Sequence, residues 1–135
     1  MKRKPLRQKS LTKTTWKRAF RACERALIAA VNRRDQFCQM PGCGSTLTLQ
    51  MDHAIVSRKH LSTFFDIRQM VLLCRNCHCL KTFKCFGTEV KVTEIVRARE
   101  GSNFLNEIVD KSRQLKKWTL QELEDMTKKF DEVAT

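Results

Sequence analysis

Gln50-Met51-Asp52-His53, together with Cys74-Arg75-Asn76-Cys77-His78 further along the chain, carries the main signals for the fold. Apolar and polar residues alternate from residue 46 to the adjacent Asp and His, which predicts a half-buried strand that ends there. The Cys-x-x-Cys-His run opens a second element, a helix predicted over 75–86. Because consecutive strand side chains point to opposite sides, Asp52 and His53 are expected to have different tasks.

Four cysteines form two pairs with the spacing of a metal site. Cys38 and Cys43 flank a turn-forming Gln-Met-Pro-Gly insert, and Cys74 and Cys77 supply a Cys-x-x-Cys half. Four thiolates make a closed tetrahedral zinc site, which is structural because no position remains for water. In a core of modest size, zinc would contribute much of the folding free energy. The alternative is a set of free buried thiols.

These stretches resemble the HNH endonuclease family. The resemblance covers residues 34–84, and its matching parts are Cys38 to Gly44, Leu49 to His53 and Asp66 to Lys81. The connecting stretch from Ser57 to His60 is similar to that of small phage-encoded members. The resemblance implies an α+β fold, in which a small treble-clef-like ββα-metal core is stapled by zinc and flanked by N- and C-terminal helices.

The family resemblance also implies roles for the site residues. His53 would act as the general base, and Asp52 and His78 would hold a catalytic Mg²⁺ or Mn²⁺ at the scissile phosphate. Where the family has a central Asn that orients the loop bearing the first His, this chain has Gln69. Gln69 either makes the same backbone hydrogen bonds from a shifted backbone or misses them. We expect the substitution Gln69→Asn to leave activity unchanged or to raise it.

Positive charge is concentrated at the N-terminus, although the net charge of the whole chain is +13. Residues 1–34 carry twelve Lys or Arg and one acidic residue. Residues 85–135 carry nine Lys or Arg and ten acidic residues. Such a field attracts nucleic acid, unless it serves only as a solubilising tail. The candidate DNA contacts are Arg18, Arg21, Arg25, Arg58, Lys59, Arg68 and Lys81. For single residues among these, ordinary solvated charge is the alternative.

The domain organisation follows from patterning. Residues 1–14 are predicted to be a basic arm that is disordered without DNA, and residues 15–135 a single nuclease domain with its core at 34–86. A helix is predicted over about 15–33, with Trp16 and Phe20 on its apolar stripe. The connection after His53 is expected to include a return strand near 54–56.

The remaining residues, 87–135, are predicted to form a helical extension. Residues 89–99 fit either a strand or a helix, and Gly101 as a stop favours the helix. Ser102 is expected to cap a further helix with Leu115 facing inward, and the capping box Thr119-Leu-Gln-Glu122 opens the last one. These helices either buttress the core or bind a protein partner.

The sequence disfavours an exported disulfide-bonded protein and a membrane-spanning one. Seven cysteines are an odd number and the chain opens Met-Lys-Arg-Lys, which disfavour the first class, and no apolar stretch is long enough to span a bilayer. A cytoplasmic monomer is therefore expected, in the host cytoplasm if the chain is phage-encoded.

The sequence predicts a metal-dependent DNA endonuclease or nickase. The alternatives are a zinc-stabilised DNA-binding or adaptor module without efficient chemistry and a structural treble-clef protein. RNA is disfavoured because no solvent-facing aromatic platform is apparent.

Overall fold

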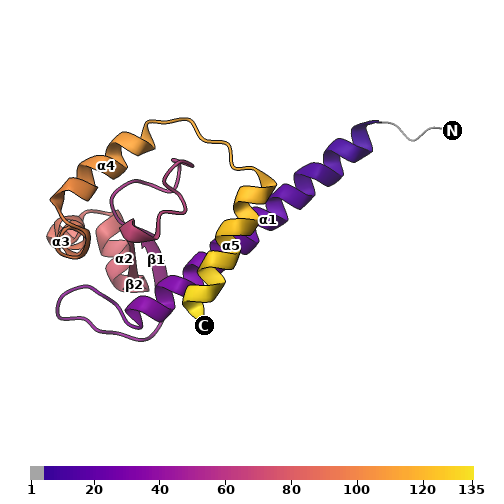
Figure 1. Cartoon of the computed structure of the whole chain (residues 1–135). Helices are drawn as coiled ribbons and strands as arrows, with labels where there is room; N and C mark the ends of the chain where they lie inside the picture. The colour runs from indigo at the N-terminus through magenta and orange to yellow at the C-terminus, as the bar shows by residue number, and fades with distance from the viewer. Residues whose placement is uncertain (1–4) are drawn as a thin grey trace.

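The computed structural model describes the backbone of residues 5–135 and the side chains from Thr15 onward. Over this range the chain has an α+β fold, as predicted, with five α-helices and a two-stranded antiparallel sheet (Figure 1). The elements are α1 (Pro5–Asp35), β1 (Leu49–His53), β2 (Met70–Cys74), α2 (Arg75–Thr82), α3 (Thr88–Glu100), α4 (Ser102–Ser112) and α5 (Leu120–Ala134). Two 3₁₀ turns, Ile67–Gln69 and Cys85–Gly87, precede β2 and α3.

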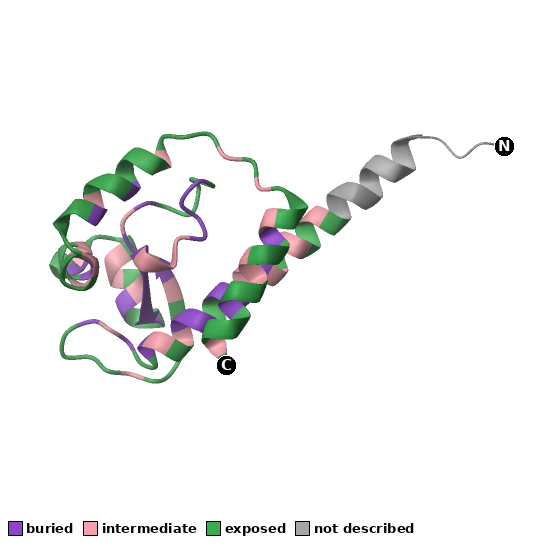
Figure 2. Cartoon of the chain, in the orientation of Figure 1, coloured by how far each residue is buried: buried purple, intermediate pink, exposed green. Residues whose placement is uncertain are grey.

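The sheet separates two apolar cores. In the antiparallel register Asp52 lies opposite Val71. Because side chains alternate across a strand, Met70 and Leu72 face a core built with α1 and α5, whereas Val71 and Leu73 face a core built with α3, α4 and the cysteine site. All of β2 is buried (Figure 2), as a strand covered on both faces requires.

The helix α1 is the longest element, and its N-terminal part projects away from the sheet while α5 lies along it (Figure 1). Its predicted apolar stripe is confirmed. Leu27 and Val31 are fully buried, the rings of Trp16 and Phe20 stack at 5.2 Å, and the indole of Trp16 donates a hydrogen bond to the carbonyl of Trp118 at 2.7 Å. The stripe therefore fastens α1 to both the sheet and the C-terminal helix.

The start of α1 differs from the prediction. The helix begins at Pro5 rather than near residue 15, so residues 5–14 of the predicted disordered arm are helical. Proline suits the first helical position because its φ is already helical and its missing N–H is not needed there. The rest of the predicted arm, residues 1–4, lies outside the described residues.

The predicted return strand at 54–56 is wrong, because the partner of β1 is β2. The backbone N–H groups of Ala54 and Val56 bond to Gln69 instead of to a strand. β1 also begins later than the alternation suggested, since Thr48 adopts a left-handed φ of 53° and Leu47 is exposed. An alternating pattern gives the faces of a strand but not its partner.

The C-terminal helices buttress the two cores. The helix favoured over 89–99 is confirmed as α3, and Thr119 and Glu122 form the predicted capping box of α5. Leu123 is buried against α1, but Leu115, predicted to face inward, is fully exposed. Ser102 is the first residue of α4 and not its cap, which is Gly101. Between residues 5 and 135 no helix is both long and apolar enough to cross a bilayer.

Candidate functional site

Four thiols converge where the loop after α1 meets the start of α2. The Sγ atoms of Cys38, Cys43, Cys74 and Cys77 all lie within 4.8 Å of one another, and those of Cys43 and Cys74 are 3.8 Å apart. A tetrahedral zinc site with Zn–S bonds of about 2.3 Å places its sulfurs about 3.8 Å apart. The four residues predicted from the sequence therefore fit a structural metal such as zinc.

Local structure prepares this site. Cys74 is the N-cap of α2, and its Sγ accepts the backbone N–H of Cys77 at 3.4 Å. Burial alone would raise the pKa of the Cys74 thiol, but this hydrogen bond and the neighbouring thiols lower the pKa below its ordinary value. On the loop, Cys43 N–H donates to the carbonyl of Met40 in a turn where Gly42 has a φ of 82°. The metal would thus join the loop, the sheet and α2.

A second polar cluster lies on the α2 side of β1. The buried Asp52 carboxylate lies 3.4 Å, through Oδ1, from His78 Nε2. Two ligands of Mg²⁺ bound at about 2.1 Å in adjacent positions lie about 3.0 Å apart, so this pair has nearly the spacing of a shared cation. Lys81 Nζ lies 3.0 Å from Oδ2 and 3.3 Å from Oδ1, and it donates a hydrogen bond to Oδ1. Oδ2 accepts no hydrogen bond from any described residue.

His53 occupies the other side of the strand end. Its Nε2 lies 3.1 Å from the carbonyl oxygen of Phe64, and the two rings pack at 4.9 Å. A carbonyl can only accept, so the neutral ring carries its proton on Nε2 and leaves Nδ1 as a free acceptor. The pKa of His53 is lowered from its ordinary value, first by burial and further by Arg58, despite the opposing bond to Phe64. The ring is therefore kept as a neutral base.

Gln69 fixes the loop that follows His53. Its side chain is fully buried, and its Oε1 accepts the backbone N–H groups of Val56 at 2.8 Å and Ile55 at 3.3 Å. Its Nε2 donates to the carbonyl of Thr63 at 3.0 Å. The longer amide thus makes the loop-orienting hydrogen bonds. The expected effect of Gln69→Asn, unchanged or raised activity, remains a prediction.

One pocket of about 900 Å³ brings the cluster and His53 together. Its walls come from α1, from β1 and the loop after it, and from α2 with the turn that follows. Its lining residues are Glu24, Ile28, Leu49, Gln50, Met51, Asp52, His53, Ile55, Ser57, Arg58, His78, Lys81, Thr82 and Lys84. The His53 imidazole and the side chains of Asp52 and His78 therefore line the same solvent-accessible space.

Two of the predicted DNA contacts lie at this pocket. Lys81 reaches the Asp52 carboxylate, and Arg58 lines the wall, where it forms an ion pair with Glu24 at 3.3 Å and lies over the ring of Phe64 at 5.7 Å. Because Arg58 is otherwise largely exposed, its guanidinium is available to a phosphate entering the pocket.

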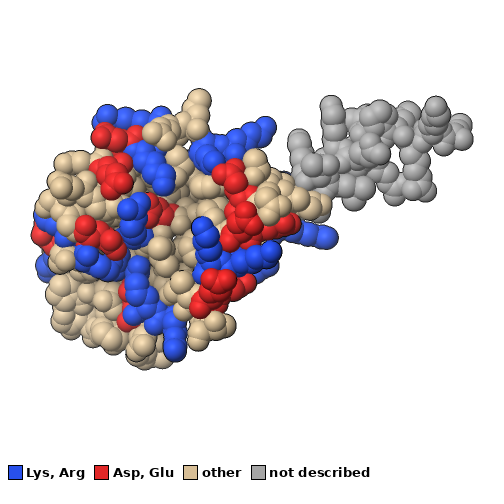
Figure 3. All heavy atoms as spheres, viewed as in Figure 1, with Lys and Arg blue, Asp and Glu red and all other residues tan. Residues whose placement is uncertain are grey.

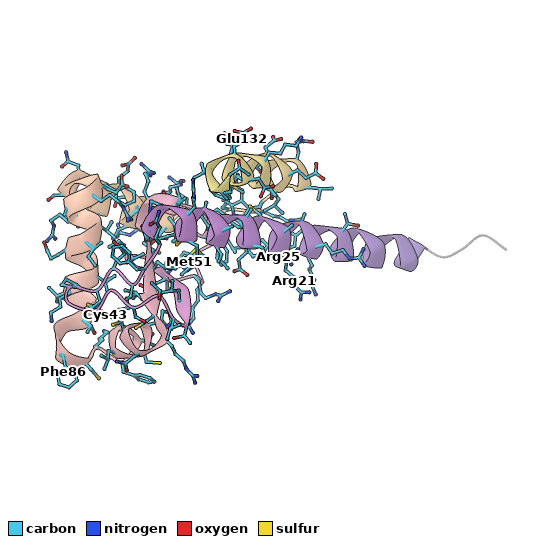
Figure 4. The ribbon with its side chains drawn as sticks, turned by 90° about the horizontal axis from the view of Figure 1, so that it is seen from below. Arg21, Arg25, Cys43, Met51, Phe86 and Glu132 are labelled. Carbon is cyan, nitrogen blue, oxygen red and sulfur yellow. The ribbon has the colours of Figure 1, made fainter. Side chains whose placement is uncertain are left out.

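The other predicted contacts lie elsewhere. Arg18, Arg21 and Arg25 are exposed on α1, and Figure 4 shows Arg21 and Arg25 on the side away from α5. Lys59 is exposed but does not line the pocket. Arg68 is engaged elsewhere, in an ion pair with Asp66 at 2.8 Å and over the ring of Phe104. On the face seen in Figure 3, basic and acidic side chains are interspersed.

Three features of the site were not predicted from the sequence. The carbonyl of Phe64 fixes the His53 tautomer, Glu24 reaches the pocket from α1, and Lys81 pairs with Asp52. A backbone carbonyl carries no sequence signal. The i, i+3 spacing of His78 and Lys81 on one helix could have indicated that both reach the same carboxylate.

No family model matches the chain, and neither a curated protein nor a solved structure matches it significantly.

Proposed function

We propose that this protein is a metal-dependent DNA endonuclease or nickase of the HNH type. The observation that carries the proposal is the convergence of Asp52, His53 and His78 on one pocket, with Gln69 holding the intervening loop. Phosphodiester hydrolysis needs a base for the attacking water and positive charge at the phosphate. The pocket contains residues suited to both tasks.

His53 is the proposed general base. The bond from Nε2 to the Phe64 carbonyl fixes the ring, so Nδ1 accepts the proton of a water molecule. The lowered pKa keeps Nδ1 unprotonated at neutral pH. Arg58 at the wall, which Glu24 holds by an ion pair, contacts a phosphate of the nucleic acid strand.

Asp52 and His78 are the proposed ligands of a divalent ion. A bound Mg²⁺ or Mn²⁺ would supply Lewis-acid stabilisation of the negative charge that develops on the phosphate. Lys81 competes for the same carboxylate, because its ammonium is in ion-pair contact with Asp52. Lys81 would give up this contact if a cation occupied the pair, and its positive charge would then be available to the phosphate.

DNA is the proposed substrate because the net charge of +13 and the exposed arginines of α1 favour a long polyanion. These arginines lie on the helix that also supplies Glu24 and Ile28 to the pocket. Binding along α1 would therefore lead a strand toward His53.

The test is conversion of supercoiled plasmid to nicked and linear forms with Mg²⁺, with Mn²⁺ and with EDTA. Wild-type protein is expected to cut only with a divalent ion, and His53→Ala to lose cutting by at least a hundredfold. His60→Ala is the matched control, because His60 is exposed and does not line the pocket. Equal cutting by the two histidine variants would refute the role of His53.

A second function is favoured by one observation, the Lys81 ammonium on Asp52. If Lys81 permanently neutralises that carboxylate, the protein is a zinc-stabilised DNA-binding module without chemistry. Folded, zinc-loaded protein would then bind DNA but would not cut it, whichever metal is added. DNA affinity would also survive the loss of Asp52, His53 and His78.

A further inference from the structure

Two phenylalanines are exposed in the turn that joins α2 to α3. Phe83 is 76% and Phe86 is 85% exposed, whereas Phe64, Phe65 and Phe104 in the same chain are all buried. Figure 4 shows Phe86 at the outer edge of the molecule. Burying such rings is strongly favourable, so two of them in one solvent-exposed turn indicate a binding surface.

The backbone of this turn holds the rings outward. Lys84 has φ 55° and Phe86 has φ 56°, both in the left-handed region that side chains other than glycine seldom adopt, and Gly87 follows with φ 66°. This conformation costs free energy, and the exposed rings make no buried contacts that would offset the cost. Contacts with a ligand would offset it.

The turn is continuous with the candidate site. Thr82 and Lys84, the residues on either side of Phe83, both line the pocket that contains His53. Lys81 lies one residue further back at the Asp52 carboxylate. Along the chain the two phenylalanines therefore alternate with Lys81 and Lys84, cationic residues that line the pocket a phosphate-bearing strand would occupy.

We propose that Phe83 and Phe86 stack on unpaired bases, so that the preferred substrate is DNA with a single-stranded or opened segment. Aromatic rings beside a basic groove are the general means of holding single strands, because every base offers a face for stacking. The proposal rests on the proposed function only in that the pocket binds DNA. It also corrects the expectation that the chain lacks a solvent-facing aromatic platform.

A protein partner is the weaker occupant. The turn offers two rings separated by Lys84 and Cys85 and bordered by Thr82, not a continuous apolar patch. Cationic residues next to aromatic faces complement a nucleic acid strand, which presents phosphates and bases in alternation.

The test measures binding in EDTA, so that no cutting is needed. Fluorescence anisotropy compares a labelled duplex with the same duplex carrying a short single-stranded gap, for wild type and for Phe83→Ala/Phe86→Ala. Leu115→Ala is the matched control, since Leu115 is a fully exposed apolar side chain outside the pocket. A Phe83→Trp/Phe86→Trp variant tests whether any aromatic ring suffices, and thermal unfolding checks that every variant is folded.

Wild type is expected to bind the gapped DNA at least tenfold more tightly than the duplex. The double alanine variant should lose this preference, while the tryptophan and Leu115 variants keep it. Equal affinity of wild type for both DNAs, or an unchanged preference in the double alanine variant, would overturn the proposal. The turn would then be assigned to binding a protein partner. If the preference is lost as expected but wild type cuts no DNA with any metal, this inference stands and the nuclease assignment fails.

Discussion

Replacing Gln69 with alanine tests whether this side chain organises the loop between the two strands. The change removes three hydrogen bonds, to Ile55 and Val56 on one side of the loop and to Thr63 on the other. Val56 and Thr63 are buried, so their freed backbone groups find no water. Each buried group without a partner costs about 1–3 kcal/mol. A cavity also remains, and the expected loss of stability is at least about 3 kcal/mol.

The assay is urea unfolding of zinc-saturated protein followed by circular dichroism. Gln114→Ala is the matched control because Gln114 is exposed, and its effect should stay within about 0.5 kcal/mol. A loss below about 1 kcal/mol for Gln69→Ala would show that Gln69 does not organise this loop. DNA cutting by the variant should fall by more than its unfolded fraction explains, because the loop begins directly after His53.

Four further predictions concern the metal, the base and the exposed turn. Cys43→Ser should lower both the zinc content, measured by elemental analysis, and the unfolding midpoint, the latter by more than about 10 °C, whereas the equally exposed Cys79→Ser should change neither. Because burial lowers the pKa of His53, the acid limb of the kcat/KM profile should lie below about pH 6.5, and a limb above that value would contradict the assignment. The same shift makes the folded state lose stability as pH falls below about 6.5, where the unfolded histidine binds a proton more readily. Phe86→Gly should raise stability by about 1 kcal/mol in thermal unfolding, because glycine adopts the left-handed φ without strain.

The parts of the fold that were predictable have local signals. The Cys-x-x-Cys half and the turn between Cys38 and Cys43 fix which thiols meet, since a closed zinc site needs four of them. The capping box at Thr119 fixes the start of α5 for a similarly local reason. Such features depend on a few neighbouring residues, so the sequence shows them directly.

The parts that were not predictable depend on tertiary contacts. The partner of β1 is β2 rather than residues 54–56, because the side chain of Gln69 takes the backbone groups that a strand would have paired. Arg68 was expected near the phosphate, but Asp66 holds it elsewhere. The exposure of Phe83 was also hidden, since an aromatic residue in a helix-like pattern is usually buried.

Mn²⁺ binding to the zinc-loaded protein, measured by electron paramagnetic resonance, tests the proposed metal site without any knowledge of the preferred DNA. We expect one Mn²⁺ site per chain that His78→Ala weakens at least tenfold, while His60→Ala leaves it unchanged. Equal Mn²⁺ binding by the two variants would contradict the claim that Asp52 and His78 hold the ion.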